Sequence, residues 1–130
     1  MKKIFIVAAV ILTTVILFMF LNKKSSFIEY KLNGKIYKLL PAKSSSEWER
    51  GLMNYRSKKE LKGADGMIFI FPNKNFRTFW NENTYLDLDI YWLNDDKVVG
   101  KSFLPSIEKS REAVTVDSLK AVNKVIEIIR

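Results

Sequence analysis

The chain contains neither cysteine nor histidine. Without cysteine there is no disulfide, no thiolate nucleophile, no cysteine-type zinc site and no lipidated cysteine anchor. Without histidine, the usual general base at neutral pH and the commonest transition-metal ligand are both missing. Ser-His-Asp and Cys-His catalysis and the two-histidine zinc sites are therefore excluded. We expect no cofactor and no bound metal, and the sequence identifies no catalytic residue.

The net charge of +8 does not mark a nucleic-acid-binding surface. Half of it comes from two lysine pairs, Lys2-Lys3 and Lys23-Lys24, on either side of an apolar segment. The rest of the chain lacks the Lys/Arg run with interleaved aromatic residues that a nucleic-acid footprint requires. We expect no nucleic-acid partner.

The apolar segment covers residues 4–21 and carries no charge. As a helix it would be about 27 Å long, close to the thickness of the membrane hydrocarbon core. It is longer than the apolar region of a cleaved signal peptide, and no Ala-x-Ala site follows it. We predict an uncleaved transmembrane anchor, with cleavage and secretion as the alternative. The Lys2-Lys3 start is typical of export signals, so the body should lie outside the cytoplasm, although the lysine pairs nearly balance the positive-inside rule.

Residues 1–26 are thus predicted to be an anchor and tether, and residues 27–130 a single β-rich domain. Asn33-Gly34 separates two apolar/polar runs and is the strongest two-residue hairpin signal. Residues 66–71 and 76–80 predict two strands joined by a turn. Residues 85–93 alternate with period two, and a turn at 94–96 leads into a strand at 97–104.

The pattern predicts one short helix, over residues 47–53 after the first hairpin. Ser46 and Glu49 fit a capping box at its start. The C-terminal segment is ambiguous, because Leu119, Val122 and Ile129 have helical spacing while residues 125–129 are rich in the β-branched residues that favour strands.

Four motifs in order carry a family resemblance. They are Glu49-Arg50 followed by Gly51-Leu52-Met53, then the run 66–71, then Phe79-Trp80 with Asn83-Thr84, and finally Leu88-Asp89. Together they resemble the domain of unknown function 192 family, small proteins that are often exported. The resemblance implies an α+β fold, a mostly antiparallel or barrel-like β-sheet with one short helix after the first hairpin. It favours a strand at 125–128, and it implies no activity.

The chain departs from the family pattern at the third motif and just before the fourth. Asn81-Glu82 stands where the family usually has Met-Lys, and Asp87 stands where it usually has proline. A ligand that needs the usual lysine would be bound differently here, or not at all.

A polar cluster around Asp87 and Asp89 is the candidate site. Both carboxylates point to one face of the predicted strand, about 6.6–7 Å apart along it. Such a pair suits a hard cation or acid/base chemistry on a sugar bond, yet a solvated outer strand face looks the same. The ligand-binding candidates are Glu82, Asn83, Thr84, Asp87, Asp89 and Arg56.

Two further groups of residues allow two interpretations each. The arginines Arg50, Arg56 and Arg77 suit a phosphate or carboxylate ligand, but surface ion pairing is their commoner role. The aromatic residues would either line an apolar groove or, as is commoner, pack in the core. They are Phe69, Phe71, Phe76, Phe79 and Trp80.

These observations predict a membrane-anchored, extracytoplasmic, non-catalytic binding or accessory module. Its partners would be the membrane, through the N-terminal helix, and an envelope protein or polymer. The alternative is a hydrolase acting on an envelope polymer through the carboxylates of Glu82, Asp87 and Asp89.

Overall fold

The structure, a computed structural model, describes residues 26–130. The predicted membrane segment at 4–21 lies outside the described residues. Within the described part, no helix has both the length and the apolar character needed to cross a membrane.

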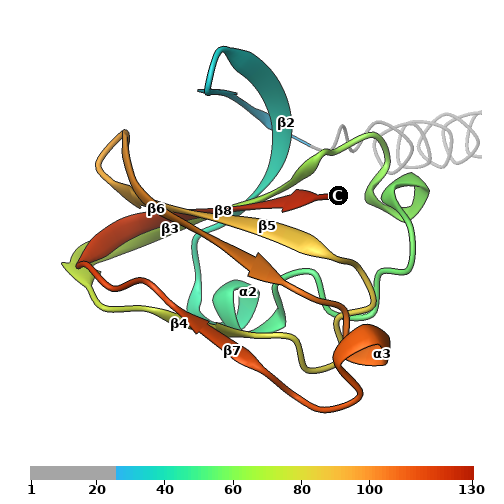
Figure 1. Cartoon of the computed structure of the whole chain (residues 1–130). Helices are drawn as coiled ribbons and strands as arrows, with labels where there is room; N and C mark the ends of the chain where they lie inside the picture. Colours follow the sequence, from blue (N-terminus) through green and yellow to red (C-terminus); the bar gives the residue numbers. More distant parts are fainter. Residues whose placement is uncertain (1–25) are drawn as a thin grey trace, which may run out of the picture.

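The domain is built on a six-stranded sheet with the order β1-β2-β3-β8-β5-β6 (Figure 1). Its strands are β1 (Ile28–Leu32), β2 (Lys35–Ala42), β3 (Gly66–Asn75), β5 (Leu88–Asn94), β6 (Lys97–Leu104) and β8 (Val122–Ile129). The predicted β-rich α+β class is confirmed, as are the first hairpin and the strands at 97–104 and 125–128. One pair, β2 with β3, is parallel, so the sheet is mixed. A parallel pair needs a long crossover, and residues 43–65 supply it.

The crossover contains α2 (Ser45–Arg50) and a 3₁₀ turn, η1 (Lys58–Leu61). The predicted helix exists, but it starts and ends earlier than residues 47–53. Its capping box uses Ser44 and Glu47, not Ser46 and Glu49. Both serines have a glutamate three residues later, but Glu47 also accepts the N–H of Lys43 at 2.6 Å, which fixes the earlier register. A second short helix, α3 (Ile107–Ser110), was not predicted, since the sequence pattern predicted one helix only.

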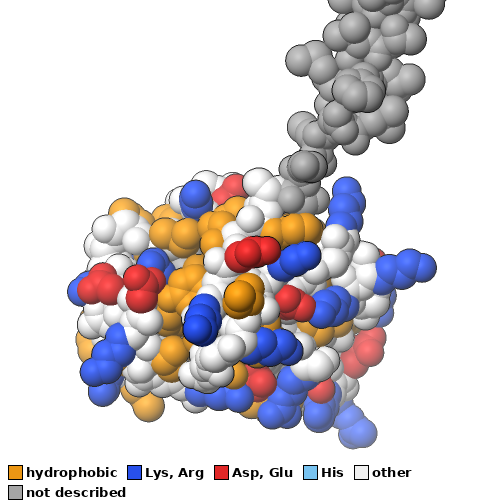
Figure 2. Space-filling model, turned by 90° about the horizontal axis from the view of Figure 1, so that it is seen from above, with side chains coloured by type: hydrophobic (Ala, Val, Ile, Leu, Met, Phe, Trp, Pro, Cys, Tyr) orange, Lys and Arg blue, Asp and Glu red, His pale blue; other side chains and the backbone are white. Residues whose placement is uncertain are grey.

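The last strand of the chain, β8, lies between β3 and β5 and is covered on both faces. Ile126 and Ile128 pack into one apolar cluster, under the β1–β2 hairpin. Val125 packs into the larger cluster on the other face. The hairpin curls over its face of the sheet, and Tyr30 Oη donates to Asp96 Oδ1 at 3.0 Å. Figure 2 looks onto that side, where Lys and Arg side chains surround scattered apolar ones, with Asp and Glu among them.

A separate two-stranded ribbon faces the other side of the sheet (Figure 1). It pairs β4 (Thr78–Trp80) with β7 (Thr115–Asp117) in antiparallel register. The predicted strand at 76–80 is therefore present, but it pairs with β7 and not with the strand before it. Phe79 anchors it to the sheet, with its ring edge-on to Phe69 at 4.8 Å and to Trp92 at 5.5 Å between centroids.

Asn81 ties the end of β4 to its surroundings. Its side chain is fully buried and donates to Pro105 O at 2.9 Å and to Ser110 Oγ at 2.8 Å. It also accepts the N–H of Val114 at 2.8 Å. The departure from the family pattern at this position is thus a structural polar group, and it holds the ribbon beside α3.

Gly66, at the start of β3, lies directly against the backbone of β8. A Cβ on this residue would lie 1.8 Å from the carbonyl oxygen of Glu127. No flexible side chain is available to yield, because the obstructing atoms belong to the backbone of β8.

We therefore expect Gly66→Ala to lower the free energy of unfolding of the full chain by at least about 2 kcal/mol, since the two strands must separate to admit the methyl group. Urea denaturation checks this. A change below about 0.5 kcal/mol, the usual range for an unstrained surface substitution, would contradict the close approach.

Candidate ligand-binding cleft

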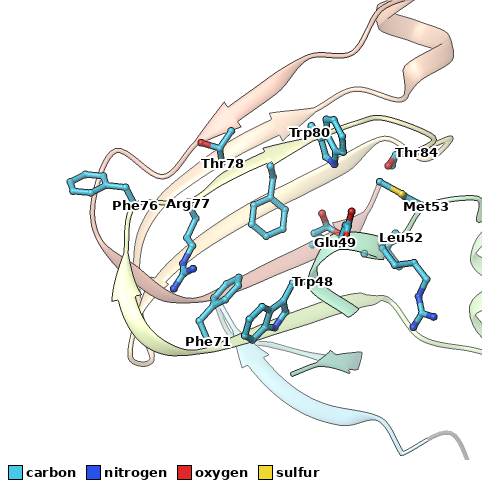
Figure 3. Close-up of a pocket in the computed structure, with 14 residues that line it drawn as sticks. Trp48, Glu49, Leu52, Met53, Phe71, Phe76, Arg77, Thr78, Trp80 and Thr84 are labelled. Carbon is cyan, nitrogen blue, oxygen red and sulfur yellow. The ribbon is translucent and has the colours of Figure 1, made fainter. Parts of the chain in front are cut away.

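A cleft of about 460 Å³ opens between α2 and β4, on the ribbon side of the sheet (Figure 3). One wall is the segment from Trp48 to Met53, and the other is the segment from Phe76 to Trp80. The volume lies within the usual range of ligand pockets, about 300–1,000 Å³. The cleft therefore has room for a ligand of substantial size.

Aromatic rings form most of the apolar lining. Trp48 is fixed by a hydrogen bond from its Nε1 to Ala42 O at 3.0 Å, and its ring lies 4.9 Å from that of Phe71. Phe79 closes the inner side against the core. At the mouth, Trp80 is 47% exposed and Phe76 is 70% exposed. Large apolar side chains left in water at a concave site are typical of a binding surface.

Glu127 forms part of the cleft lining from the centre of the sheet. It shares a face of β8 with Val125, so its side chain enters the larger apolar cluster, and it is only 4% exposed. Its Oε2 has no hydrogen-bond partner in the described part of the chain. Burial raises the pKa of Glu127 to about 8, because the charged form loses its hydration. The carboxyl is mostly uncharged at neutral pH.

Arg77 lines the same cleft from the residue before β4. Its guanidinium lies 3.8 Å from the centroid of the Phe71 ring, and Figure 3 shows it pointing in that direction. Its Nη2 donates to Asn73 O and to Asn73 Oδ1, both at 2.9 Å. Burial lowers the pKa of Arg77, and its Nε is left without a partner.

Within the residues that the structure describes, Arg77 Nε and Glu127 Oε2 are the two buried side-chain atoms without a hydrogen-bond partner. Both belong to residues that line this cleft. Such atoms are rare in folded proteins, and each costs about 1–3 kcal/mol. Their convergence on one cavity is expected of a site that a ligand completes.

The predicted site residues are divided between this cleft and other surfaces. Thr84 is buried and lines the cleft. Asn83 is exposed and has a positive φ of 51°, and its carbonyl accepts the N–H of Asn54 at 2.8 Å. Arg56 stacks 3.8 Å over the Tyr85 ring and pairs with Glu108 at 3.3 Å. The remaining candidates, Glu82, Asp87 and Asp89, also lie outside the cleft lining.

Asp87 and Asp89 are each held by partners. Asp87 accepts the N–H of Ser106 at 2.8 Å and pairs with Lys109 at 3.2 Å, and these contacts hold the pKa of its carboxyl below the usual value. Asp89 pairs with Arg130 at 3.1 Å and with Lys101 at 3.3 Å. Within residues 26–130, no group of three or more acidic side chains is placed to hold a metal ion. Asp87 thus holds the segment that contains Ser106 and Lys109. Asp89 links β5 to Lys101 in β6 and to Arg130.

Sequence reasoning missed Glu127, and it left the aromatic groove as the less favoured interpretation. Four of the five aromatic candidates line the cleft, namely Phe71, Phe76, Phe79 and Trp80, whereas Phe69 is buried in the core. A signal for Glu127 was present. It is the one charged residue in the run Val125-Ile126-Glu127-Ile128-Ile129. It lies two residues after Val125 and therefore on the same, inward-facing side of the strand.

Comparison with known proteins supports the predicted resemblance. The profile of the domain of unknown function 192 family (DUF192, "Uncharacterized ACR") matches residues 28–130. A "putative transcription regulator" from Sinorhizobium meliloti 1021 is a similar solved structure, with 24% identity and a TM-score of 0.60 over 82% of this chain and 84% of that chain. A protein of unknown function from Novosphingobium aromaticivorans DSM 12444 has 21% identity and a TM-score of 0.62 over 82% and 83%.

At these identities, the two structures show a shared fold alone. A search of curated proteins found no match.

The burial of Glu127 predicts a pH-dependent stability. Its pKa is raised from 4.5 to about 8 in the folded chain. Between these two values the folded state holds a proton that the unfolded state has released, so stability falls as pH rises through this window. Glu127→Gln should remove this pH dependence. The free energy of unfolding of the variant, relative to that of wild type, should then rise with pH by at most about 1.4 kcal/mol per pH unit.

Urea unfolding of the full chain between pH 5 and 8 measures this difference. Glu49→Gln is the matched control, because Glu49 lines the same cleft but is exposed. A Glu127→Gln profile parallel to wild type at every pH would show that the acid is hydrated.

Proposed function

The chain belongs to the domain of unknown function 192 family, and we propose that its domain is a non-catalytic binding module whose ligand occupies the cleft between α2 and β4. The observation that carries this proposal is the convergence of two unpartnered buried polar atoms, Arg77 Nε and Glu127 Oε2, on one aromatic cavity. A ligand that supplies partners to both would recover the free energy that they cost the empty domain.

The motifs that carry the family resemblance also support the cleft. The segment from Glu49 to Met53 lines it, and so do Phe71, Phe79, Trp80 and Thr84. These residues are far apart in the sequence but meet at one cavity. Of the last two residues of the third motif, Thr84 faces the cleft and Asn83 does not.

Binding fits the site better than hydrolysis does. The hydrolase alternative relied on Glu82, Asp87 and Asp89, but both aspartates are occupied by ion pairs, and none of the three lines the cleft. The chain has no histidine or cysteine to act as base or nucleophile. Glu127, with its raised pKa, is suited to donate a hydrogen bond to a neutral ligand.

We further propose, from the sequence of residues 4–21 and its lysine flanks, that the domain is tethered to the cell membrane and lies outside the cytoplasm. Tethering raises the local concentration of the domain near envelope partners, so that weak contacts suffice. The partner would be an envelope protein or polymer.

The cleft proposal predicts where ligands bind. In a nuclear magnetic resonance screen of the full chain against a mixed library of small amides, sugars and short peptides, bound compounds should shift the indole signals of Trp48 and Trp80. Trp80→Ala should weaken any such compound by at least about tenfold, as expected of a central aromatic contact.

Phe103→Ala is the matched control, because Phe103 is an aromatic residue, 36% exposed, outside the cleft lining. It should change affinity less than about twofold. Compounds that bind elsewhere, or that tolerate Trp80→Ala and Phe103→Ala equally, would refute the cleft as the site.

The tether proposal predicts that the full chain stays with cell membranes after alkaline carbonate extraction, whereas a variant lacking residues 4–21 does not. Protease added outside the membrane should digest the domain. The mass of the isolated chain distinguishes an uncleaved anchor from a cleaved signal. An intact chain in the cytosolic fraction would overturn the proposal.

A further inference from the structure

The hydrogen bonds of the β4–β7 ribbon leave one edge of β4 unpaired. Arg77 O accepts the N–H of Ser118 at 2.9 Å, and Asn81 N–H donates to Val114 O at 3.2 Å. Antiparallel strands pair in this way at alternate residues, so residues 77, 79 and 81 are bonded to β7. Thr78 and Trp80 must direct their N–H and C=O groups away from β7.

This unpaired edge faces the cleft. β4 lies between β7 and α2, as Figures 1 and 3 both show, and Thr78, Phe79 and Trp80 all line the cavity. In the described part of the chain, no backbone or side-chain group bonds the N–H or C=O of Thr78 or Trp80. One end of the cleft is closed where Asn54 N–H donates to Asn83 O at 2.8 Å.

The edge carries none of the residue types that usually protect an unpaired strand, and only its length of three residues limits pairing. Exposed edges are normally blocked by proline, lysine or a covering segment. β4 reads Thr-Phe-Trp, and exposed Trp80 and Phe76 flank the opening. An added strand would lie about 4.8 Å from β4, on the side of the cleft.

We propose that this edge binds an extended polypeptide segment of a partner protein as an added strand, with one of its side chains entering the aromatic cleft beside Glu127. The inference rests on the proposed function and names the class of ligand. A strand has hydrogen-bonding groups at every second residue, about 6.6–7 Å apart, which is the spacing of Thr78 and Trp80. Since β4 has three residues, the paired part of the ligand is about 10 Å long.

The entering side chain is uncharged and carries one hydrogen-bonding group, as Thr, Asn or Gln does. It enters a cavity that Phe79 and Glu127 both line, and the buried Oε2 of Glu127 has no hydrogen-bond partner in the described residues. Arg77, whose guanidinium is stacked on Phe71, lines the same cleft, and its buried Nε has no partner in the described residues. A charged side chain would lose hydration in this largely aromatic cleft.

The test uses the full chain and a pool of random hexapeptides displayed on phage. The selected consensus peptide is then synthesised, and its affinity is measured by calorimetry. Thr78→Pro removes one N–H of the unpaired edge and no backbone hydrogen bond to β7, although it also removes the side-chain bond from Thr78 Oγ1 to Asp117 Oδ1 at 2.6 Å. It should weaken binding by at least about tenfold. Thr115→Pro is the matched control, because Thr115 opposes Trp80 and directs its N–H away from β4; it should change affinity less than about twofold.

If Thr78→Pro fails to fold, two measurements on the wild-type chain test strand addition instead. Bound peptide should slow amide hydrogen exchange at Thr78 and Trp80 together, by at least about tenfold. N-methylation of successive peptide residues should weaken binding at every second position only.

Peptide binding without protection of these amides and without this alternation would overturn strand addition and leave the cleft as a ligand site. If no peptide is selected but small molecules or a second copy of this chain bind, strand addition by a partner protein would likewise be overturned and the cleft would remain a ligand site. Absence of every ligand from the cleft would overturn the proposed function as well.

Discussion

The structure depends on the pairing of β8 between β3 and β5. This last strand joins the two halves of the sheet, and both of its faces are covered by apolar clusters. Its placement in the centre carries Glu127 into the interior, and the glycine at position 66 allows the backbones to approach closely enough for this to happen. The acid at the base of the cleft is therefore a consequence of the sheet topology, fixed by the same contacts that stabilise the core.

The cleft follows from a second feature, the departure of β4 from the sheet. Because β4 pairs with β7 and rests on the core only through Phe79, it leaves a gap between itself and α2. Exposed rings and two polar atoms that lack partners belong to the residues that line this gap. This arrangement is unfavourable for the empty domain. Stability is commonly sacrificed in this way where a protein must recognise something else. The proposed binding and the stability of the domain would thus be linked through the protonation of Glu127.

Local patterns predicted most of the strands, because hairpin signals and two-residue alternation act over short distances. Asn33-Gly34 fixed the first turn, and the alternation of residues 88–92 matches their burial. The capping box was misplaced because two serines offered equal spacing, and only Glu47 reaches the N–H of Lys43. The site was harder to predict, because it arises from long-range pairing. Asp87 and Asp89 looked available in the sequence, but Lys109 and Arg130, distant along the chain, occupy them. Glu127 was hidden among apolar neighbours until strand order showed which face it occupies.

The central claim is that Glu127 lies uncharged and unpartnered at the base of an open cleft. A nuclear magnetic resonance titration of the ¹³C-labelled side-chain carboxyl of Glu127, in the free full-length chain, tests it most directly. We expect a midpoint near pH 8, the result of burial alone. A midpoint close to the ordinary value of 4.5 would mean that water or an undescribed group already satisfies the carboxyl, and the account of the cleft would be wrong.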